Sequence, residues 1–277
     1  MIESQIKVLT VREAISKLTF WVKSGNTFLH LRYNDGEWIS MFNLSTPNKT
    51  AGGEHHYTLE VGKALKQSYD EVSKLILNDP TNILIGSNWR FSYELVSAKH
   101  FLRYIQQTKG LLETTQWSVG DFWYLTEEEG CVSEVDHVDD KGTIQLMQTL
   151  RESSRKVIFV CNNVTNPAQY ILGASQVILI PFKEAWTEYE RILIECRLAV
   201  EEDCIFVWCA GFAKALAVTI KQEFPTSSHL DFGSFFDVVF GLHVRGWQQR
   251  KSSIPGDDRH WKYATEVLTP LVLGFIP

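Results

Sequence analysis

The second half of the chain alternates short apolar runs with longer amphipathic ones, and this alternation constrains the fold most. The strand-like runs lie at 156–161, 176–180, 204–209 and 228–232, and helical patterns lie between them at 184–200 and 213–222. Apolar runs of this length are typical of strands that are buried on both faces, as in parallel sheets covered by helices. The alternation therefore predicts an α/β protein with a Rossmann-like, mostly parallel sheet and helices on both faces.

The first half contains the same two kinds of segment in a less regular order. Thr10 and Glu13 have the spacing of a capping box, which predicts a helix that ends near residue 23. We expect further strands at 28–32, 38–42 and 82–85, and further helices at 59–77 and 93–107. Residues 114–140 are rich in Trp, acidic and turn residues, and they predict no clear element.

Length and composition are those of one large domain. The chain has 277 residues, of which 44% are hydrophobic and 22% are charged, so a sizeable core can form and bulk disorder is excluded. We expect a single α/β catalytic domain over residues 1–241. Residues 242–277 are expected to form a C-terminal extension that packs on the same domain.

The charge and the cysteines exclude several classes of protein. A formal net charge of -6 argues against nucleic-acid binding, which needs clustered positive charge. No apolar run approaches the ~20 residues that span a bilayer, and the first residues lack a signal-peptide pattern, so we expect a cytoplasmic protein without a transmembrane segment. The five cysteines are not spaced as metal ligands and are expected to be buried thiols.

An acidic turn follows the strand expected at 28–32. Asp35 and Glu37 are separated by one glycine, and two carboxylates so placed can converge on a hard divalent cation such as Mg²⁺ or Mn²⁺. The same spacing also arises by chance in a chain with this many acids, in which case the turn is only solvated. Its position favours a site, because ligands of open α/β sheets bind at the carboxyl ends of the strands.

Two later segments also lie where an expected strand ends. Gly211 joins a strand to a helix whose first N–H groups can approach a phosphate, or it serves only tight packing. Asp231 and Asp237 flank Gly233 after the last expected strand, where either acid can act as a base or simply cap a helix.

In this order, the segments resemble the motifs of the GT-D family of sugar-nucleotide-dependent glycosyltransferases. The matching residues are Arg32-Tyr33-Asn34-Asp35-Gly36-Glu37, Ile180-Pro181-Phe182-Lys183-Glu184-Ala185-Trp186, Ala210-Gly211-Phe212-Ala213 and Asp231-Phe232-Gly233. Five positions depart from the family pattern: Asn34, Glu184, Phe212, Ser234 and Asp237, the last of which lies one residue further along than the family's aspartate. The departures near Ser234 leave Asp231 or Asp237 as the catalytic base, with Asp231 ahead because its match to the family is in register.

The resemblance implies transfer of a sugar from a UDP-sugar or another nucleoside diphosphate-sugar to a hydroxyl of a glycan or glycoprotein. It implies that Asp35 and Glu37 hold a divalent metal, Mn²⁺ or Mg²⁺, against the diphosphate. Arg32, Gly211 and Lys183 are expected to contact the donor as well. Asp231 and Asp237 are the expected catalytic residues.

Two other readings of the sequence stay open at this point. The first is a non-catalytic, Rossmann-like module that binds a nucleotide or a polysaccharide. The second is a metal-dependent phosphoesterase that uses Asp35, Glu37 and Asp231, although two-metal sites need more His and Asp ligands than these spacings offer.

Overall fold

The computed structural model describes the chain in segments that include nearly all of its second half up to residue 240. The described residues are 6–9, 11–33, 37, 40–41, 59–78, 81–87, 112–115, 140–182, 184–209, 212–233, 235–240 and 274. The expected helix at 93–107 lies outside them, as does the extension at 242–277 apart from Gly274.

Eight strands form one sheet in the order β1-β4-β3-β2-β8-β7-β5-β6. The strands are β1 (Ile6–Leu9), β2 (Leu29–Tyr33), β3 (Ile83–Ser87), β4 (Leu112–Thr115), β5 (Val157–Cys161), β6 (Gln176–Leu179), β7 (Ile205–Trp208) and β8 (Ser228–Asp231). Every described pair of neighbouring strands is parallel. The predicted class, an α/β protein with a Rossmann-like parallel sheet, is therefore confirmed.

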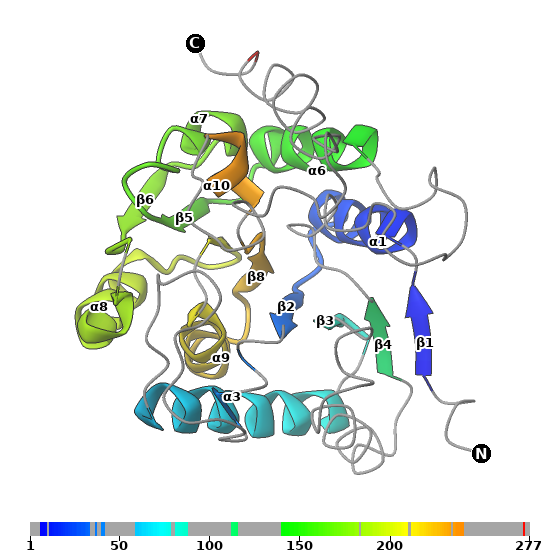
Figure 1. Ribbon diagram of the computed structural model, residues 1–277. Coiled ribbons are helices and arrows are strands. Elements are labelled where there is room, and N and C mark those ends of the chain that lie inside the picture. The colour runs from blue at the N-terminus through cyan, green and yellow to red at the C-terminus, as the bar shows by residue number, and fades with distance from the viewer. Residues whose placement is uncertain are drawn as a thin grey trace, which may run out of the picture.

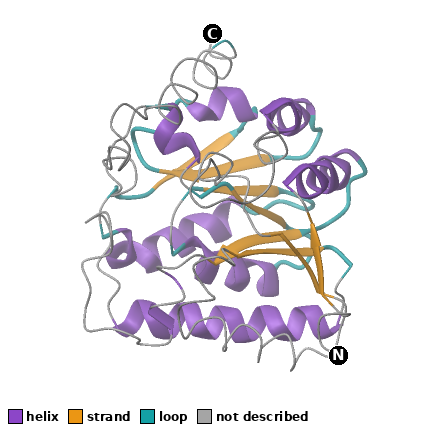
Figure 2. Ribbon diagram, turned by 45° about the vertical axis from the view of Figure 1, so that its right-hand side comes forward, coloured by secondary structure: helices purple, strands orange, loops and turns teal. Residues whose placement is uncertain are grey.

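Helices cover both faces of this sheet, as Figures 1 and 2 show. They are α1 (Val11–Lys23), α3 (Leu59–Asn78), α6 (Asp140–Glu152), α7 (Ala168–Leu172), the 3-10 helix η3 (Ala185–Glu188), α8 (Tyr189–Ala199), α9 (Ala213–Glu223) and α10 (Phe235–Val239). Among the described residues, no helix is long and apolar enough to cross a membrane.

Two separate hydrophobic cores fill the space between the sheet and its helices. Helices α3, α8 and α9 pack on one face, where Leu29, Leu31 and Tyr33 of β2 are buried. Helices α1, α6, α7 and α10 pack on the other face. Successive side chains of a strand point to opposite faces, so His30 and Arg32 face the α1 and α10 side.

Most predicted elements are found close to their expected bounds, and one is wrong. Residues 38–42 were expected to form a strand, but Ser40 and Met41 are helical, as is Glu37. Met41 is buried in the α3-side core, so packing against α3 overrides the strand propensity of this aromatic and β-branched run. The short strands β1 and β4 and the helices α6 and α7 were not predicted.

The cysteines behave as expected where they are described. Cys161, Cys196, Cys204 and Cys209 are buried free thiols. Burial raises the pKa of both the Cys161 and the Cys196 thiol to about 12, so neither is a ready nucleophile. Cys131 lies outside the described residues.

The close approach of Gly62 to the segment after Glu37 gives a test of this packing. A Cβ at Gly62 of α3 would lie 2.3 Å from the carbonyl oxygen of Ser40. We expect Gly62→Ala to lower the free energy of unfolding by about 1–3 kcal/mol in urea titrations, because the backbone of one segment must shift. The control is Gln67→Ala, an exposed position of the same helix, which should stay within about 0.5 kcal/mol of wild type.

Candidate active site

The two strands at the centre of the sheet, β2 and β8, send the chain to opposite faces where they end. After β2 the chain reaches Met41 in the α3-side core, and after β8 it enters α10, whose Phe235 and Phe236 lie in the other core. Neighbouring strands with this divergence leave a crevice at their carboxyl ends, which is where ligands of open α/β sheets bind. The candidate site is therefore the carboxyl end of the β2–β8 pair.

A buried ion cluster occupies this position. The ammonium of Lys214, in the first turn of α9, donates to Oε1 of Glu37 at 2.7 Å and lies 3.4 Å from Oδ2 of Asp231. The side chains of Lys214 and Asp231 are 0% exposed and that of Glu37 is 4% exposed. One cation thus joins two carboxylates that come from different segments of the chain.

Asp231 also accepts hydrogen bonds from two backbone N–H groups. Its Oδ2 accepts from the N–H of Arg32 at 3.2 Å, and its Oδ1 accepts from the N–H of Gly233 at 2.8 Å. These bonds tie the end of β8 to the end of β2. The orientation of the Asp231 carboxylate is therefore set by donors from three elements.

Arg32 is buried next to the backbone of Gly233. Gly233 has a φ of +57°, and a Cβ built on it would lie 2.6–2.8 Å from the guanidinium atoms of Arg32. Glycine is required here for two reasons, its left-handed backbone and the close approach of the guanidinium. The resemblance that placed Arg32 and the Asp231–Gly233 segment in one site agrees with this contact.

The charges of this cluster act on Glu37. Burial on its own would raise the pKa of Glu37, but the ammonium of Lys214 and the guanidinium of Arg32 outweigh it and lower the pKa to about 2. Glu37 is therefore ionised throughout the physiological range.

A histidine on β2 lies close to the same cluster. His30 is fully buried, and neither of its ring nitrogens has a hydrogen-bond partner among the described residues. Burial lowers the pKa of His30 to about 4; the carboxylate of Asp231 opposes this shift, while Arg32 and Lys214 add to it. His30 is thus neutral at pH 7.

The second predicted catalytic acid, Asp237, lies at the same end of the sheet but on the α10 side. It is in the first turn of α10 and is 5% exposed. Burial raises the pKa of the Cys209 thiol well above its ordinary range, and the neighbouring Cys161, Asp237 and Asp231 raise it further. Because Cys209 directly follows β7, this coupling places Asp237 near the carboxyl ends of β7 and β8.

The structure therefore brings together three of the predicted site residues, Arg32, Glu37 and Asp231, and places Asp237 at the same end of the sheet. Asp35, Lys183 and Gly211 lie outside the described residues, so their roles stay predictions. Lys214 was not predicted as a site residue. The sequence does contain a signal for it, because this lysine interrupts a run of small and apolar residues that is typical of a buried helix. In the structure every side chain at 212–218 is indeed buried.

The expected divalent metal needs several carboxylate or imidazole ligands that converge on one point. Among them, no group of three or more His, Cys, Asp or Glu side chains can hold a metal ion. Glu37, the described member of the expected ligand pair, already has the ammonium of Lys214 on Oε1. Asp35, the other expected ligand, lies outside the described residues, so the divalent metal stays a prediction.

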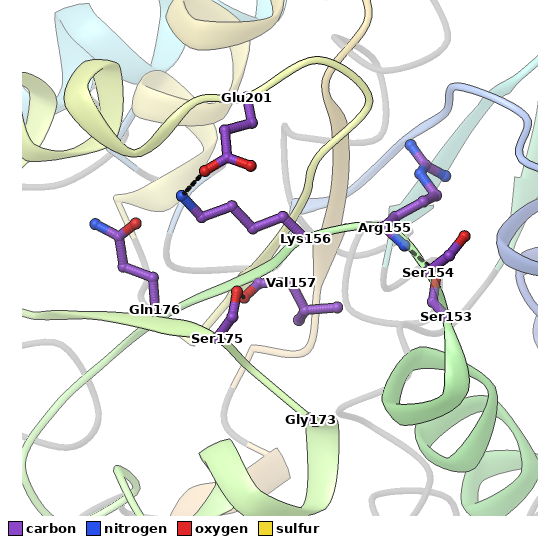
Figure 3. Close-up of a pocket in the computed structure, with 9 residues that line it drawn as sticks. All are labelled: Ser153, Ser154, Arg155, Lys156, Val157, Gly173, Ser175, Gln176 and Glu201. Carbon is purple, nitrogen blue, oxygen red and sulfur yellow. Dashed lines mark hydrogen bonds and ion pairs between the residues drawn. The ribbon is translucent and has the colours of Figure 1, made fainter.

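A hollow lined by residues 153–157, 173, 175, 176 and 201 lies away from this cluster (Figure 3). Ser154 and Lys156 precede β5, and Ser175 precedes β6, so the hollow is at the amino ends of these strands. The ammonium of Lys156 in this hollow is paired with Glu201 at 2.7 Å. It is distant from the strand ends that carry the buried ion cluster, and we assign no function to it.

The chain thus has an α/β fold with a buried ion cluster at the carboxyl ends of its two central strands. It is similar to two solved structures of the domain of unknown function 1792, one of which is described as having a distinct glycosyltransferase fold and the other of which contains selenomethionine. The TM-scores are 0.51 and 0.50, and both are 18% identical over 84% of this chain and 80% of the other. No family model and no curated protein matches the sequence. The chain therefore has this glycosyltransferase fold, as the GT-D resemblance implied.

The contact of Gly233 with Arg32 can be measured against a matched glycine. Gly25 also has a positive φ, +70°, but a Cβ built on it would meet nothing within 4 Å. Gly25→Ala should lower the free energy of unfolding by about 1 kcal/mol through backbone strain alone. Gly233→Ala should lower it by about 2–4 kcal/mol, because the guanidinium of Arg32 must also move. Equal losses in urea titrations of the two variants would contradict the close approach of Arg32.

Protonation of His30 should make stability depend on pH. Its folded-state pKa of about 4 lies below the ordinary value of 6.5, so the unfolded state binds more protons between these values. Stability should therefore fall as the pH drops from about 6.5 to 4, and His30 should contribute a loss of up to about 3 kcal/mol. Denaturant titrations at several pH values should show a smaller loss over this window in His30→Leu. The same pH dependence in both proteins would mean that His30 is not the titrating group.

Proposed function

We propose that this protein is a glycosyltransferase that moves a sugar from a nucleoside diphosphate-sugar to a hydroxyl of a glycan or glycoprotein. The observation that carries the proposal is the buried ion cluster at the carboxyl ends of β2 and β8, in a chain with a glycosyltransferase fold. The carboxyl ends of the strands are also where open α/β sheets bind nucleotides, so a nucleotide donor is expected there.

In the proposed reaction, the bond between the anomeric carbon and the β-phosphate oxygen of the donor breaks. Its electron pair leaves with the nucleoside diphosphate, and the acceptor oxygen forms the new bond to carbon. The positive N-terminal end of α9 and the positive charge of Arg32 stabilise the negative charge that develops on the diphosphate. The predicted donor contacts of Gly211 and Lys183 belong to the same part of the proposal.

The two predicted catalytic acids receive different roles in this proposal. Asp231 has no exposed surface, and its oxygens face Lys214 and two backbone N–H groups, so an acceptor hydroxyl has no route to it. We assign Asp231 to positioning the ends of β2 and β8. Asp237, at the start of α10, then accepts the proton of the acceptor hydroxyl.

Variants of the two acids test this division of roles. Release of nucleoside diphosphate from a panel of UDP- and GDP-sugars should fall by about 10²–10⁴-fold in kcat for Asp237→Asn. Asp231→Asn should lower both activity and the free energy of unfolding, because a buried cation loses a partner. The control is Asp70→Asn, an exposed acid of α3 that should behave as wild type.

Other outcomes of the same assay would overturn parts of the proposal. A folded Asp237→Asn variant with full activity would remove Asp237 from catalysis. Tight binding of a nucleoside diphosphate without turnover of any donor would make the chain a non-catalytic nucleotide-binding module.

A further inference from the structure

The side chain of Lys214 is completely buried. This residue lies in α9, where the side chains at 212–218 are all buried, and its own side chain is 0% exposed. Removing an ammonium from water costs several kcal/mol unless anionic groups compensate for it. The buried ammonium of Lys214 therefore requires anionic partners close to it.

Those partners are the two acids of the crevice. Glu37 follows β2 and lies 177 positions before Lys214 in the chain, while Asp231 ends β8. The ammonium stands between their carboxylates, at 2.7 Å from one and 3.4 Å from the other. A cation that bridges carboxylates from two strand ends is the arrangement that a hard divalent metal would otherwise make.

A divalent metal and this ammonium exclude each other at the oxygen they would share. A metal on Oε1 of Glu37 would lie within a few ångströms of the ammonium, and like charges at that separation in a buried site repel strongly. The ammonium of Lys214 already occupies the position between the carboxylates of Glu37 and Asp231.

We propose that Lys214 supplies, as part of the chain, the positive charge that a bound divalent metal would supply at this crevice, and that Glu37 is a partner of Lys214 and not a metal ligand. In this assignment Lys214 is a positioning residue, because it acts through Glu37 and Asp231. The consequence for turnover rests on the proposed glycosyl transfer, whereas the consequence for metal binding does not.

The first test uses Mn²⁺ alone as the probe. The single variant Glu37→Gln should bind Mn²⁺ with the same affinity as the wild-type protein. The affinity is measured from the electron paramagnetic resonance signal of free Mn²⁺. In Lys214→Ala, two carboxylates lose their cation, so Mn²⁺ should bind at least about 10-fold more tightly than in wild type and raise the melting temperature by several degrees. The double variant Lys214→Ala with Glu37→Gln should lose this gain.

A matched control comes from the same helix. The ammonium of Lys221 in α9 donates to the carbonyl oxygens of Pro225 and Ser227 and has no carboxylate partner among the described residues, so its removal leaves no vacant acidic site. Lys221→Ala should therefore gain no affinity for Mn²⁺. A gain of the same size in Lys221→Ala would show that any loss of a lysine from α9 has this effect, and would overturn the assignment.

Two further results would overturn the proposal. One is a wild-type Mn²⁺ site whose affinity falls more than about 10-fold in Glu37→Gln, since Glu37 would then be a ligand. The other is a folded Lys214→Ala variant that gains no Mn²⁺ binding. Where Lys214→Ala does not fold, the comparison of wild type with Glu37→Gln decides the question by itself.

The second test measures turnover after removal of metal. With EDTA present, kcat/KM for release of nucleoside diphosphate should stay within about 2-fold of its value with added Mn²⁺. A loss of more than about 10-fold that Mn²⁺ restores would overturn the proposal. Absence of turnover with every donor would count against the glycosyl transfer, and the Mn²⁺ binding result would still decide the role of Lys214.

Discussion

The ends of β2 and β8 stay joined beyond their last backbone pairing because a side chain takes the place of the backbone as hydrogen-bond acceptor. The two strands pair through Leu29 with His229 and His30 with Leu230, whereas β2 stays paired with β3 as far as Tyr33. Beyond His30, the N–H of Arg32 donates to the Asp231 carboxylate. A carboxylate reaches further than a backbone carbonyl, so the strands can diverge while the N–H at the end of β2 keeps an acceptor.

That carboxylate is itself buried, and its charge explains the other groups around it. A carboxylate without compensation in a protein interior is strongly destabilising, so Asp231 requires donors and a nearby cation. Lys214 provides the cation and then needs a second anion of its own, which is Glu37. The cluster thus forms one unit in which each member compensates its neighbour, and the depressed pKa of Glu37 reflects its strong interaction with the ammonium.

The sheet could be predicted from sequence because its strands are apolar runs bounded by polar residues. This holds for β5, β6 and β7, whose bounds agree with expectation to within a residue or two. The strands β1 and β4 could not be predicted because their sequences, IKVL and LETT, contain Lys, Glu and Thr and do not form a continuous apolar run. The helical state of Ser40 also depends on a distant contact, its packing on Gly62, and the local run of Trp and Ile favours a strand.

Only those residues of the candidate site that lie within a recognisable sequence motif could be predicted. Arg32, Glu37 and Asp231 lie in segments that match the GT-D pattern, and the structure brings them together at one end of the sheet. Lys214 has no such motif, because its role arises from two partners in other segments. A lysine in the first turn of a helix is opposed by the helix dipole, and here it is also opposed by complete burial. When a sequence places a charge where both local effects disfavour it, the compensation must come from tertiary contacts, so such a residue is a strong candidate for the centre of a site.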